Sequence, residues 1–203
     1  MAETKPSRKV VEYPPKHKDK SAHQTIYIYW AVPEDVPHLI EIERSASELF
    51  RHIGMDSVAY DEPPSEIHLI KDSISNRILL ASEDPSLESS PVAYLSMELD
   101  EDHKTVYLAQ VSVDYRYARK GIGERLIDHL EAYAHRKGYE TIVLTTFKDV
   151  PWNGPYYQRL GFYELDAEQL KRPEHGTVSD HLDAEKENDR INKWSRVAMR
   201  KDL

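Results

Sequence analysis

The feature that most constrains this chain is a strand, a glycine turn and a helix that follow one another between Thr105 and Gly138. Thr105–Val113 is rich in β-branched and aromatic residues, which is typical of a half-buried strand. The basic turn Arg119-Lys120-Gly121-Ile122-Gly123 follows, and apolar residues then recur at helical spacing. Gly138 is placed to end this helix in a left-handed cap. The segment therefore predicts a strand-turn-helix unit.

The glycine turn has a physical use beyond connecting two elements. Two glycines let the backbone approach a ligand closely, and the free N–H groups of the first helical turn point at an anion. By itself, one Gly-x-Gly turn still favours a plain connection between a strand and a helix. A second stretch changes this balance. An apolar strand over Thr141–Thr146 is followed by Tyr157, which stands four residues before Gly161-Phe162.

The stretches VSVDYRYARKGIGERL and LTTFKDVPWNGPYYQRLGF together resemble the GNAT superfamily of acyl-CoA-dependent N-acetyltransferases. The resemblance covers roughly Thr25–Asp166 and implies a last strand near Arg196–Arg200. One position departs from the family's pattern, which usually has Gln or Arg three residues before the first glycine, where this chain has Ala118. Because backbone amides do most of the binding in such a turn, we expect cofactor binding to survive this change.

The remaining segments predict the other elements of the fold. Thr25–Val32 has the pattern of a strand, and Pro33-Glu34-Asp35 opens a helix with a proline and acids in its first turn. Further strands are predicted at Arg77–Ser82 and Pro91–Leu99, and a short helix at Ser65–Ser73. We therefore predict an α/β (mixed α+β) fold with a GNAT-like central mixed sheet and helices on both of its faces.

The chain divides by composition into a tail, a domain and one charged segment. Residues 1–23 are polar and basic without periodicity, so we expect a disordered tail. Residues 24–203 are expected to form a single GNAT-like domain, because this length is typical of one core. Within that domain, residues 171–192 are crowded with charge and lack periodicity, which predicts a long surface loop.

Composition excludes several classes of function. The formal net charge of −9 at pH 7 argues against duplex nucleic acid as a partner. The chain has 0 cysteines, which excludes disulfides, thiolate metal sites and a cysteine nucleophile. Its histidines form no H-x-x-x-H or H-x-H pair, so no metal site is expected, and no apolar run is long enough for a membrane span. We expect a cytoplasmic protein, with the nucleus as the alternative, and consider a homodimer as its assembly.

The resemblance implies where acetyl-CoA binds as the co-substrate. Backbone groups of Val111 and Val113 would pair with the pantetheine arm as an added strand does. The N–H groups from Arg119 to Glu124 would cradle the pyrophosphate, with two basic side chains adding charge. Asn153 would either cap the following helix or bond the pantetheine. The predicted acetyl-CoA contacts are Val111, Val113, Arg119, Lys120, Gly121, Ile122, Gly123, Glu124 and Asn153.

Acetyl transfer to an amine also needs a proton for the departing thiolate and a group that takes the amine's proton. Tyr157 matches the family's tyrosine that protonates the CoA thiolate, and a phenol, with an ordinary pKa of about 10, can share its proton as the thiolate forms. The alternative for this tyrosine is a packing role. The candidates for the catalytic base are Glu98 and Tyr107. Ala109 stands where similar sequences of the family often have Glu, which leaves the base open. Gln110 could only orient another group.

The resemblance also implies which residues lie beside the acceptor. In the GNAT fold the helices after the first strand form one wall of the acceptor site, so Phe50 is a candidate contact, with an ordinary core position as the alternative. Trp152 lies between a strand and a helix and would either line the acceptor pocket or only pack there. Together with Tyr107 and Gln110, these are the four predicted substrate residues.

We predict an enzyme that transfers the acetyl group of acetyl-CoA to a small-molecule primary amine by direct attack, without a metal. An acidic protein attracts cationic substrates over long range, although the same acidity also serves solubility. Two alternatives stay open. One is a protein or peptide N-acetyltransferase, whose acceptor groove would have to admit a peptide, and the other is a non-catalytic acyl-CoA-binding module.

Overall fold

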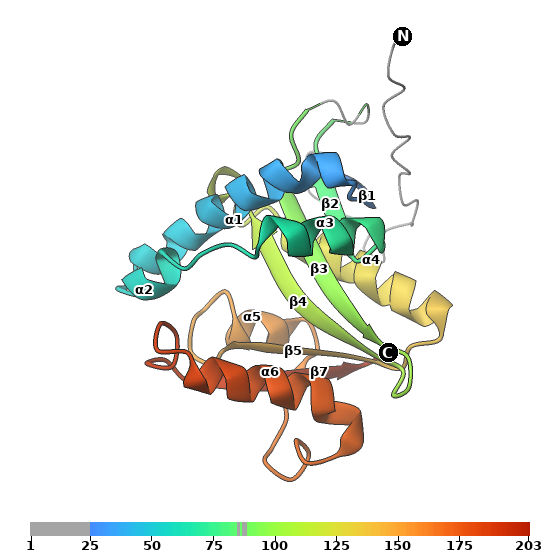
Figure 1. The fold of residues 1–203 in the computed structure, drawn as a ribbon, viewed down its shortest axis with the longest axis vertical. Coiled ribbons are helices and arrows are strands. Elements are labelled where there is room, and N and C mark those ends of the chain that lie inside the picture. The colour runs from blue at the N-terminus through green and yellow to red at the C-terminus, as the bar shows by residue number, and fades with distance from the viewer. Residues whose placement is uncertain (1–24, 85, 87–88) are drawn as a thin grey trace. The chain divides into compact units, whose positions relative to one another are not determined.

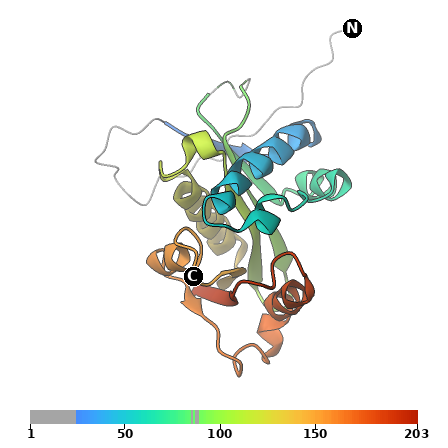
Figure 2. The same ribbon diagram turned by 90° about the vertical axis from the view of Figure 1, so that its left-hand side faces the viewer.

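The computed structural model describes residues 25–84, 86 and 89–203, and Figures 1 and 2 show them as a ribbon. The tail predicted over residues 1–23 lies outside the described residues. The chain forms two compact units. Of the described residues, the first unit comprises those from 25 to 96 together with 110–129, and the second comprises 97–109 together with 130–203. The expectation of one domain over 24–203 stays a prediction.

The described residues contain a seven-stranded mixed sheet, which confirms the predicted class of fold. Its order is β1-β2-β3-β4-β5-β7-β6. β4 pairs with β5 in parallel, whereas β1 with β2, β2 with β3, β5 with β7, and β6 with β7 pair antiparallel. The strands are β1 (Tyr27–Trp30), β2 (Ile78–Ser82), β3 (Ala93–Asp100), β4 (Thr105–Val113), β5 (Thr141–Phe147), β6 (Tyr163–Glu164) and β7 (Arg196–Asp202).

Local signals in the sequence explain where the main helices begin and end. Pro33 opens a 3-10 turn that leads directly into α1, as predicted. Ser65 caps α3 by accepting a hydrogen bond from the backbone N–H of His68 at 3.3 Å. Gly138 ends α4 with a φ of 78°, a left-handed conformation that glycine adopts without steric cost. The helices are α1 (Val36–Arg51), α2 (Asp56–Ala59), α3 (Glu66–Ile74), α4 (Ile122–Lys137), α5 (Gly154–Arg159) and α6 (Gly176–Glu187), with 3-10 turns η1 (Pro33–Asp35), η2 (Tyr115–Tyr117) and η3 (Pro173–His175).

The first unit is built on β1, β2 and the adjoining part of β3, against which α1 and α3 pack. Figures 1 and 2 show α1 and α3 together on one side of these strands. The apolar residues of α1 recur on one face of the helix, so they bury together against the strands. The resulting core contains Tyr29, Ala31, Val36, Leu39, Ile42, Leu69, Ile78, Leu80 and Tyr94.

A single carboxylate, that of Glu43, ties the middle of α1 to β3 and β4. Its Oε2 accepts hydrogen bonds from the hydroxyls of Tyr94 at 2.7 Å and Ser112 at 2.6 Å. Its Oε1 accepts a hydrogen bond from Nε2 of Gln110 at 2.8 Å. Burial, and then the charge of Glu43, raise the pKa of Tyr94 well above its usual range, so this hydroxyl remains a donor. Three neutral donors therefore satisfy one partly buried charge.

A second polar contact fastens α1 to the end of β4. Ser45 donates a hydrogen bond to Oδ1 of Asp114 at 3.0 Å and accepts one from the backbone N–H of Tyr115 at 3.1 Å. The hydrogen bond from the Arg116 guanidinium holds the pKa of the Asp114 carboxyl below its usual range. Asp114 is therefore a charged acceptor at neutral pH, and charge-assisted hydrogen bonds are the stronger kind.

The second unit is built on β5, β6, β7 and the first half of β4. α6 packs on β5 and β7, and Figure 2 shows α6, in red, and α5, in orange, on opposite sides of β7. The core under α6 contains Tyr107, Val143, Leu165, Val178, Leu182 and Ala198. Tyr107, a predicted substrate residue, is thus also part of this core.

The predicted surface loop over residues 171–192 is wrong, because η3 and the 12-residue helix α6 occupy most of that segment. Only Val178 and Leu182 of α6 are buried, and they lie one helical turn apart. Two buried apolar residues give too narrow a stripe for the helix to be recognised from its hydrophobic pattern. Contacts with the sheet therefore stabilise this helix more than its own sequence does.

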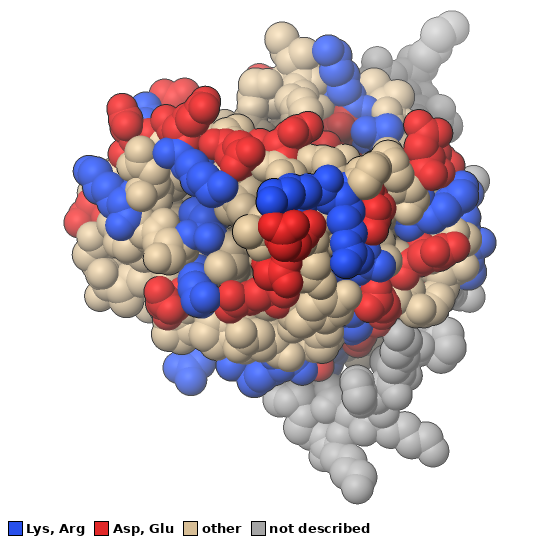
Figure 3. All heavy atoms as spheres, turned by 90° about the horizontal axis from the view of Figure 1, so that it is seen from below, with Lys and Arg blue, Asp and Glu red and all other residues tan. Residues whose placement is uncertain are grey.

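Charged side chains of both signs lie on the surface. On the face drawn in Figure 3, acidic and basic side chains lie interspersed, so the negative net charge is not gathered there into one acidic surface. Exposed ion pairs of the second unit include Lys171 with Glu168 and Lys186 with Asp183. Exposed ion pairs of this kind each contribute only about 0–1 kcal/mol to the stability of the folded protein. Within the described ranges, no helix has the length and apolar character needed to cross a membrane.

We predict that Glu43→Gln destabilises the protein. An amide offers one oxygen and one NH₂ group to three donors, so at least one of those donors would lose its acceptor, at a cost of about 1–3 kcal/mol. Thermal unfolding followed by circular dichroism should show a lower melting temperature. Glu41→Gln, at an exposed position of the same helix, is the matched control and should change the melting temperature little. Equal melting temperatures for the two variants would contradict the role of Glu43.

Candidate functional site

The basic turn before α4 has a constrained backbone. Arg119 has a φ of 62° and Gly121 a φ of 75°, so two residues in the left-handed region flank Lys120. For a residue with a side chain, such as Arg119, this region costs about 1–2 kcal/mol. Left-handed residues in a turn can direct successive N–H groups toward one side, where they form a concave site for an anion.

The turn leads directly into the N-terminus of α4. The first N–H groups of an α-helix have no acceptor within the helix, and the bond from the N–H of Arg125 to the carbonyl of Gly121, at 3.1 Å, closes the first turn. Ile122 is 2% exposed, so its side chain packs in the core and only its backbone could contact a ligand. The structure thus brings the predicted anion-binding residues together in one turn. They are Arg119, Lys120, Gly121, Ile122, Gly123 and Glu124.

Val111 and Val113 lie at the end of β4, beyond its ladder with β5. That ladder pairs Thr105–Tyr107 with Thr141–Val143. The later residues of β4 have no partner in this ladder, so their backbone groups are suited to pairing with an extended ligand. The pairing of Val111 and Val113 with pantetheine stays a prediction.

The other predicted residues of the first unit take different positions. The amide of Gln110 donates to Glu43 and, at 2.9 Å, to Oγ of Ser112. Gln110 therefore orients another group, and that group is Glu43. Phe50 is partly buried near the end of α1, and its contact with substrate stays a prediction.

In the second unit, Tyr157 lies on α5 with 9% of its surface exposed. Its ring packs edge-on against Phe162, with ring centroids 5.6 Å apart, and against Tyr156 at 5.4 Å. Burial raises the pKa of Tyr157 well above its usual range, although the positive charge of Arg196 acts in the opposite direction. The phenol is therefore protonated at neutral pH and able to donate a proton.

The start of α5 admits only glycine. A Cβ added to Gly154 would lie 2.3 Å from the backbone oxygen of Lys148, so the helix begins in close contact with the segment that follows β5. This contact places the helix that carries Tyr157. Sequence reasoning missed it, because a single glycine between Asn153 and a proline does not reveal which backbone it touches.

Asn153 does not cap α5 with its side chain. Its Nδ2 instead donates a hydrogen bond to Oγ1 of Thr146 at 3.0 Å. Its Oδ1 is buried and has no hydrogen-bond partner in the part of the chain that the structure describes. An unpaired buried acceptor can bond an amide N–H of a ligand such as pantetheine. Trp152, one residue earlier, is partly buried.

A polar cluster in the same unit centres on Tyr107. Its hydroxyl lies 3.0 Å from Oγ1 of Thr145, which donates to Oε1 of Glu185 at 2.7 Å. Nε of Arg196 donates to Oε2 of Glu185 at 2.8 Å. Because the Thr145 hydrogen is directed at Glu185, Tyr107 must donate to Thr145. Burial raises the pKa of Tyr107 to about 12, so this phenol does not act as a proton acceptor at neutral pH.

Glu98, the other candidate base, is paired with a histidine. Its Oε1 lies 3.2 Å from Nε2 of His181 on α6. The imidazole of His181 stacks on the ring of Tyr107, with centroids 4.0 Å apart and planes 2° apart. The hydrogen bond with Glu98 raises the pKa of His181 above its usual value, against the effect of partial burial. The structure thus brings Glu98 and Tyr107 together around His181.

Sequence reasoning missed His181, Glu185 and Arg196. The first two lie in the segment that was expected to be a loop. Their spacing of four residues, which places both side chains on one face of a helix, is the only local signal for them. Arg196 begins the predicted last strand, and no motif surrounds it.

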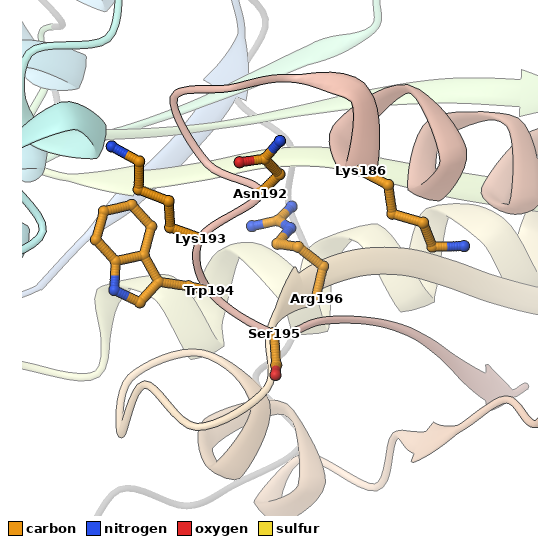
Figure 4. A pocket seen from close by; sticks show the side chains of 6 residues that line it. All are labelled: Lys186, Asn192, Lys193, Trp194, Ser195 and Arg196. Carbon is orange, nitrogen blue, oxygen red and sulfur yellow. The ribbon is translucent and has the colours of Figure 1, made fainter.

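A cavity of about 270 Å³ adjoins this cluster at Arg196. Figure 4 shows the side chains that line it, which come from the end of α6 and from the segment that leads into β7. Arg196 belongs to both the cavity lining and the polar cluster, because its guanidinium also binds Glu185. The guanidinium carbon lies 4.3 Å from the centroid of the Phe147 ring. The lining residues are Lys186, Asn192, Lys193, Trp194, Ser195 and Arg196.

The model of the Acetyltransferase (GNAT) family matches residues 39–162, which include the glycine turn, α4 and the Tyr157 motif. The chain belongs to this family. The resemblance seen in the sequence is therefore confirmed.

Individual relatives are distant. A segment of 52 residues is 40% identical to Probable N-acetyltransferase 14 of Xenopus tropicalis and covers 26% of this chain and 25% of that protein, so the match spans a quarter of the relative's length. Among solved structures, PaiA N-acetyltransferase from Thermoplasma acidophilum in complex with coenzyme A has a TM-score of 0.60, with 16% identity and coverage of 88% of this chain and 99% of that one. The ribosomal-protein-S18-alanine N-acetyltransferase from Escherichia coli also has a TM-score of 0.60, with 17% identity and coverage of 88% and 94%. At these identities the likeness shows a shared fold.

The residues of the α4 turn fit the co-substrate of this family. Free backbone N–H groups at a helix start, with the side chains of Arg119 and Lys120 beside them, match the needs of a pyrophosphate. The unpaired Oδ1 of Asn153 fits an amide of pantetheine. Among the residues that the structure describes, no group of three or more His, Cys, Asp and Glu side chains could hold a metal ion.

We predict that Gly121→Val weakens acetyl-CoA binding. A β-branched residue at a φ of 75° is strained and would displace the N–H groups of the turn. Gly54 has almost the same φ, 76°, and a Cβ added to either glycine would meet nothing within 4 Å. Gly54→Val therefore imposes the same backbone strain outside the turn and is the matched control. Titration calorimetry should show about a ten-fold or greater loss of affinity, roughly 1.4 kcal/mol or more, in Gly121→Val alone. The same affinity in both variants would contradict this site.

Proposed function

We propose that this GNAT enzyme transfers the acetyl group of acetyl-CoA to the primary amine of a small molecule by direct attack. The observation that carries the proposal is the cavity of about 270 Å³ next to Arg196. Its volume is close to the lower end of the range of small-molecule sites, about 300–1,000 Å³. The cluster that it adjoins includes the pair of Glu98 and His181. Tyr157, a protonated phenol, is near enough to feel the charge of Arg196. A base and a proton donor are the groups that acetyl transfer requires.

The reaction can be written with its protons balanced. An amine that is protonated at neutral pH first loses a proton and becomes a nucleophile. Its nitrogen attacks the thioester carbonyl carbon, a C–N bond forms, and the C–S bond breaks with its electron pair going to sulfur. The nitrogen loses a second proton to become an amide, and the thiolate gains one.

Tyr157 is assigned the proton that the thiolate receives. Burial keeps the phenol protonated at neutral pH, so its O–H is in place as a hydrogen-bond donor when negative charge develops on the sulfur. The general base is assigned to the hydrogen-bonded pair that Glu98 forms with His181. The α4 turn is assigned to holding the pyrophosphate of acetyl-CoA.

We expect the purified protein to release CoA thiol from acetyl-CoA with small primary amines and far less with peptides. A thiol-release assay should compare a panel of small mono- and diamines with peptides that have free N-termini or lysine side chains. Peptides belong in this panel because a structural neighbour is a ribosomal-protein-S18-alanine N-acetyltransferase. Release with peptides alone would favour a protein N-acetyltransferase. Binding of acetyl-CoA without release for any acceptor would indicate a binding module.

We predict that Tyr157→Phe lowers turnover by about 10²–10⁴-fold, the usual contribution of general acid catalysis. The substitution keeps the ring and its contact with Phe162 and removes only the hydroxyl. The affinity for acetyl-CoA should hardly change, because the hydroxyl acts when charge develops on sulfur. Turnover and acetyl-CoA affinity should be measured separately.

The control for this variant is Tyr156→Phe, which makes the same change at the partly buried neighbour on α5. This variant should keep near-normal turnover. If Tyr157→Phe also turned over normally, the thiolate would have to receive its proton from another donor or from water.

A further inference from the structure

We propose that His181 is the general base that takes a proton from the acceptor amine, and that Glu98 is its positioning residue. This inference rests on the proposed acetylation of an amine. It assigns a function to a side chain on α6 that no sequence motif identifies. It also gives Glu98 a different role from the one predicted for it.

The contact with Glu98 decides which nitrogen of the His181 imidazole can accept a proton. Oε1 of Glu98 lies 3.2 Å from Nε2 of the ring. A carboxylate only accepts hydrogen bonds, so Nε2 must carry the hydrogen, and the lone pair of the neutral ring is then on Nδ1. Nδ1 has no hydrogen-bond partner within the described part of the chain. Nδ1 is therefore the nitrogen available to a substrate.

The stack with Tyr107 fixes the plane of the His181 ring. The two rings are almost parallel, with centroids 4.0 Å apart. Tyr107 is itself held by Thr145, which binds Glu185 one helical turn after His181 on α6. α6 is thus joined to β4 and β5 at two successive turns. A base held in this way needs little reorganisation before it accepts a proton.

The pair is accessible as well as ordered. The side chain of His181 keeps 38% of its surface exposed, and that of Glu98 keeps 40%. Tyr107, beneath the imidazole, is only 4% exposed. An amine arriving from solvent can therefore approach the imidazole from its open side, and the proton that it loses can pass on to water.

The groups that face His181 come from three elements: Glu98 on β3, Tyr107 on β4, and Asp180 and Glu185 on α6 itself. The hydrogen bond with Glu98 has the largest effect on the pKa of His181 and raises it. Partial burial lowers this pKa, and the charges of Glu185 and Asp180 raise it. The net effect raises this pKa, which makes the neutral imidazole a stronger proton acceptor than an isolated histidine.

The other candidate bases fit this role less well. Tyr107 is protonated at neutral pH, with a pKa of about 12. Glu43 has both carboxylate oxygens engaged by three donors. Glu98 already uses an oxygen in holding His181, and a carboxylate is intrinsically a weaker base than an imidazole.

The first test is the pH dependence of turnover at saturating substrates, from about pH 5 to about pH 9, the range in which imidazoles titrate. In the unaltered protein, turnover should fall as the pH drops through the pKa of His181, because a protonated imidazole cannot accept a proton. His181→Gln should lose about 10²–10⁴-fold in turnover together with this acidic limb, and added imidazole should restore part of the activity. His68→Gln, which alters an exposed histidine paired with Asp72 on α3, should leave the profile unchanged.

The second test uses Glu98→Gln, which removes the charge but keeps an oxygen that can accept the hydrogen of Nε2. Because Glu98 raises the pKa of His181, its neutralisation should lower that pKa and move the acidic limb to lower pH. An NMR titration of the His181 imidazole in both proteins measures this shift without any turnover. A His181 pKa that does not respond to Glu98→Gln, or normal turnover in His181→Gln, would overturn the proposal. Absence of acetylation of any amine by the unaltered protein would instead contradict the proposed function.

Discussion

The parallel pairing of β4 with β5 is the constraint on which the rest of the structure depends. It comprises only three residue pairs, Thr105–Tyr107 with Thr141–Val143, and a hydrogen bond of 2.8 Å joins the buried hydroxyls of its first pair. Parallel neighbours require a crossover connection, so the glycine turn and α4 must come between these strands. Because side chains alternate along a strand, β4 then directs Gln110 and Ser112 together toward Glu43. One strand therefore both begins the parallel ladder and holds α1.

A second constraint is the need to satisfy buried polar groups. The hydrogen bonds of Tyr107, Thr145, Glu185 and Arg196 match each donor to an acceptor, and the guanidinium also lies over the ring of Phe147. A poorly exposed ion pair is costly unless its remaining hydrogen bonds are made. This cluster is complete only when α6 lies on the sheet, so it adds specificity to a helix with few apolar contacts.

The protein raises the pKa of two groups for opposite physical reasons. The charged form of a tyrosine is an anion, which burial disfavours, so Tyr157 keeps its proton. The charged form of a histidine is a cation, which a neighbouring carboxylate favours, so His181 gains affinity for a proton. At the same pH, the environment of Tyr157 therefore keeps a proton donor protonated, and the environment of His181 makes a proton acceptor stronger. Groups whose environments differ in this way are suited to the acid and base halves of one reaction.

The sequence by itself determined the strand-turn-helix unit from Thr105 to Gly138, because strand propensity, glycine conformation and helical periodicity act within a few residues. The candidate acetyl-CoA turn could be predicted for the same reason, since all of its N–H groups come from one short segment. Only the tertiary structure decided that α6 is a helix, because its stability comes from the sheet beneath it. It alone also placed Glu43 among donors 51 to 69 residues away along the chain and paired Glu98 with His181. These contacts depend on which strands are neighbours and which helix covers them, and no local pattern in the sequence contains that information.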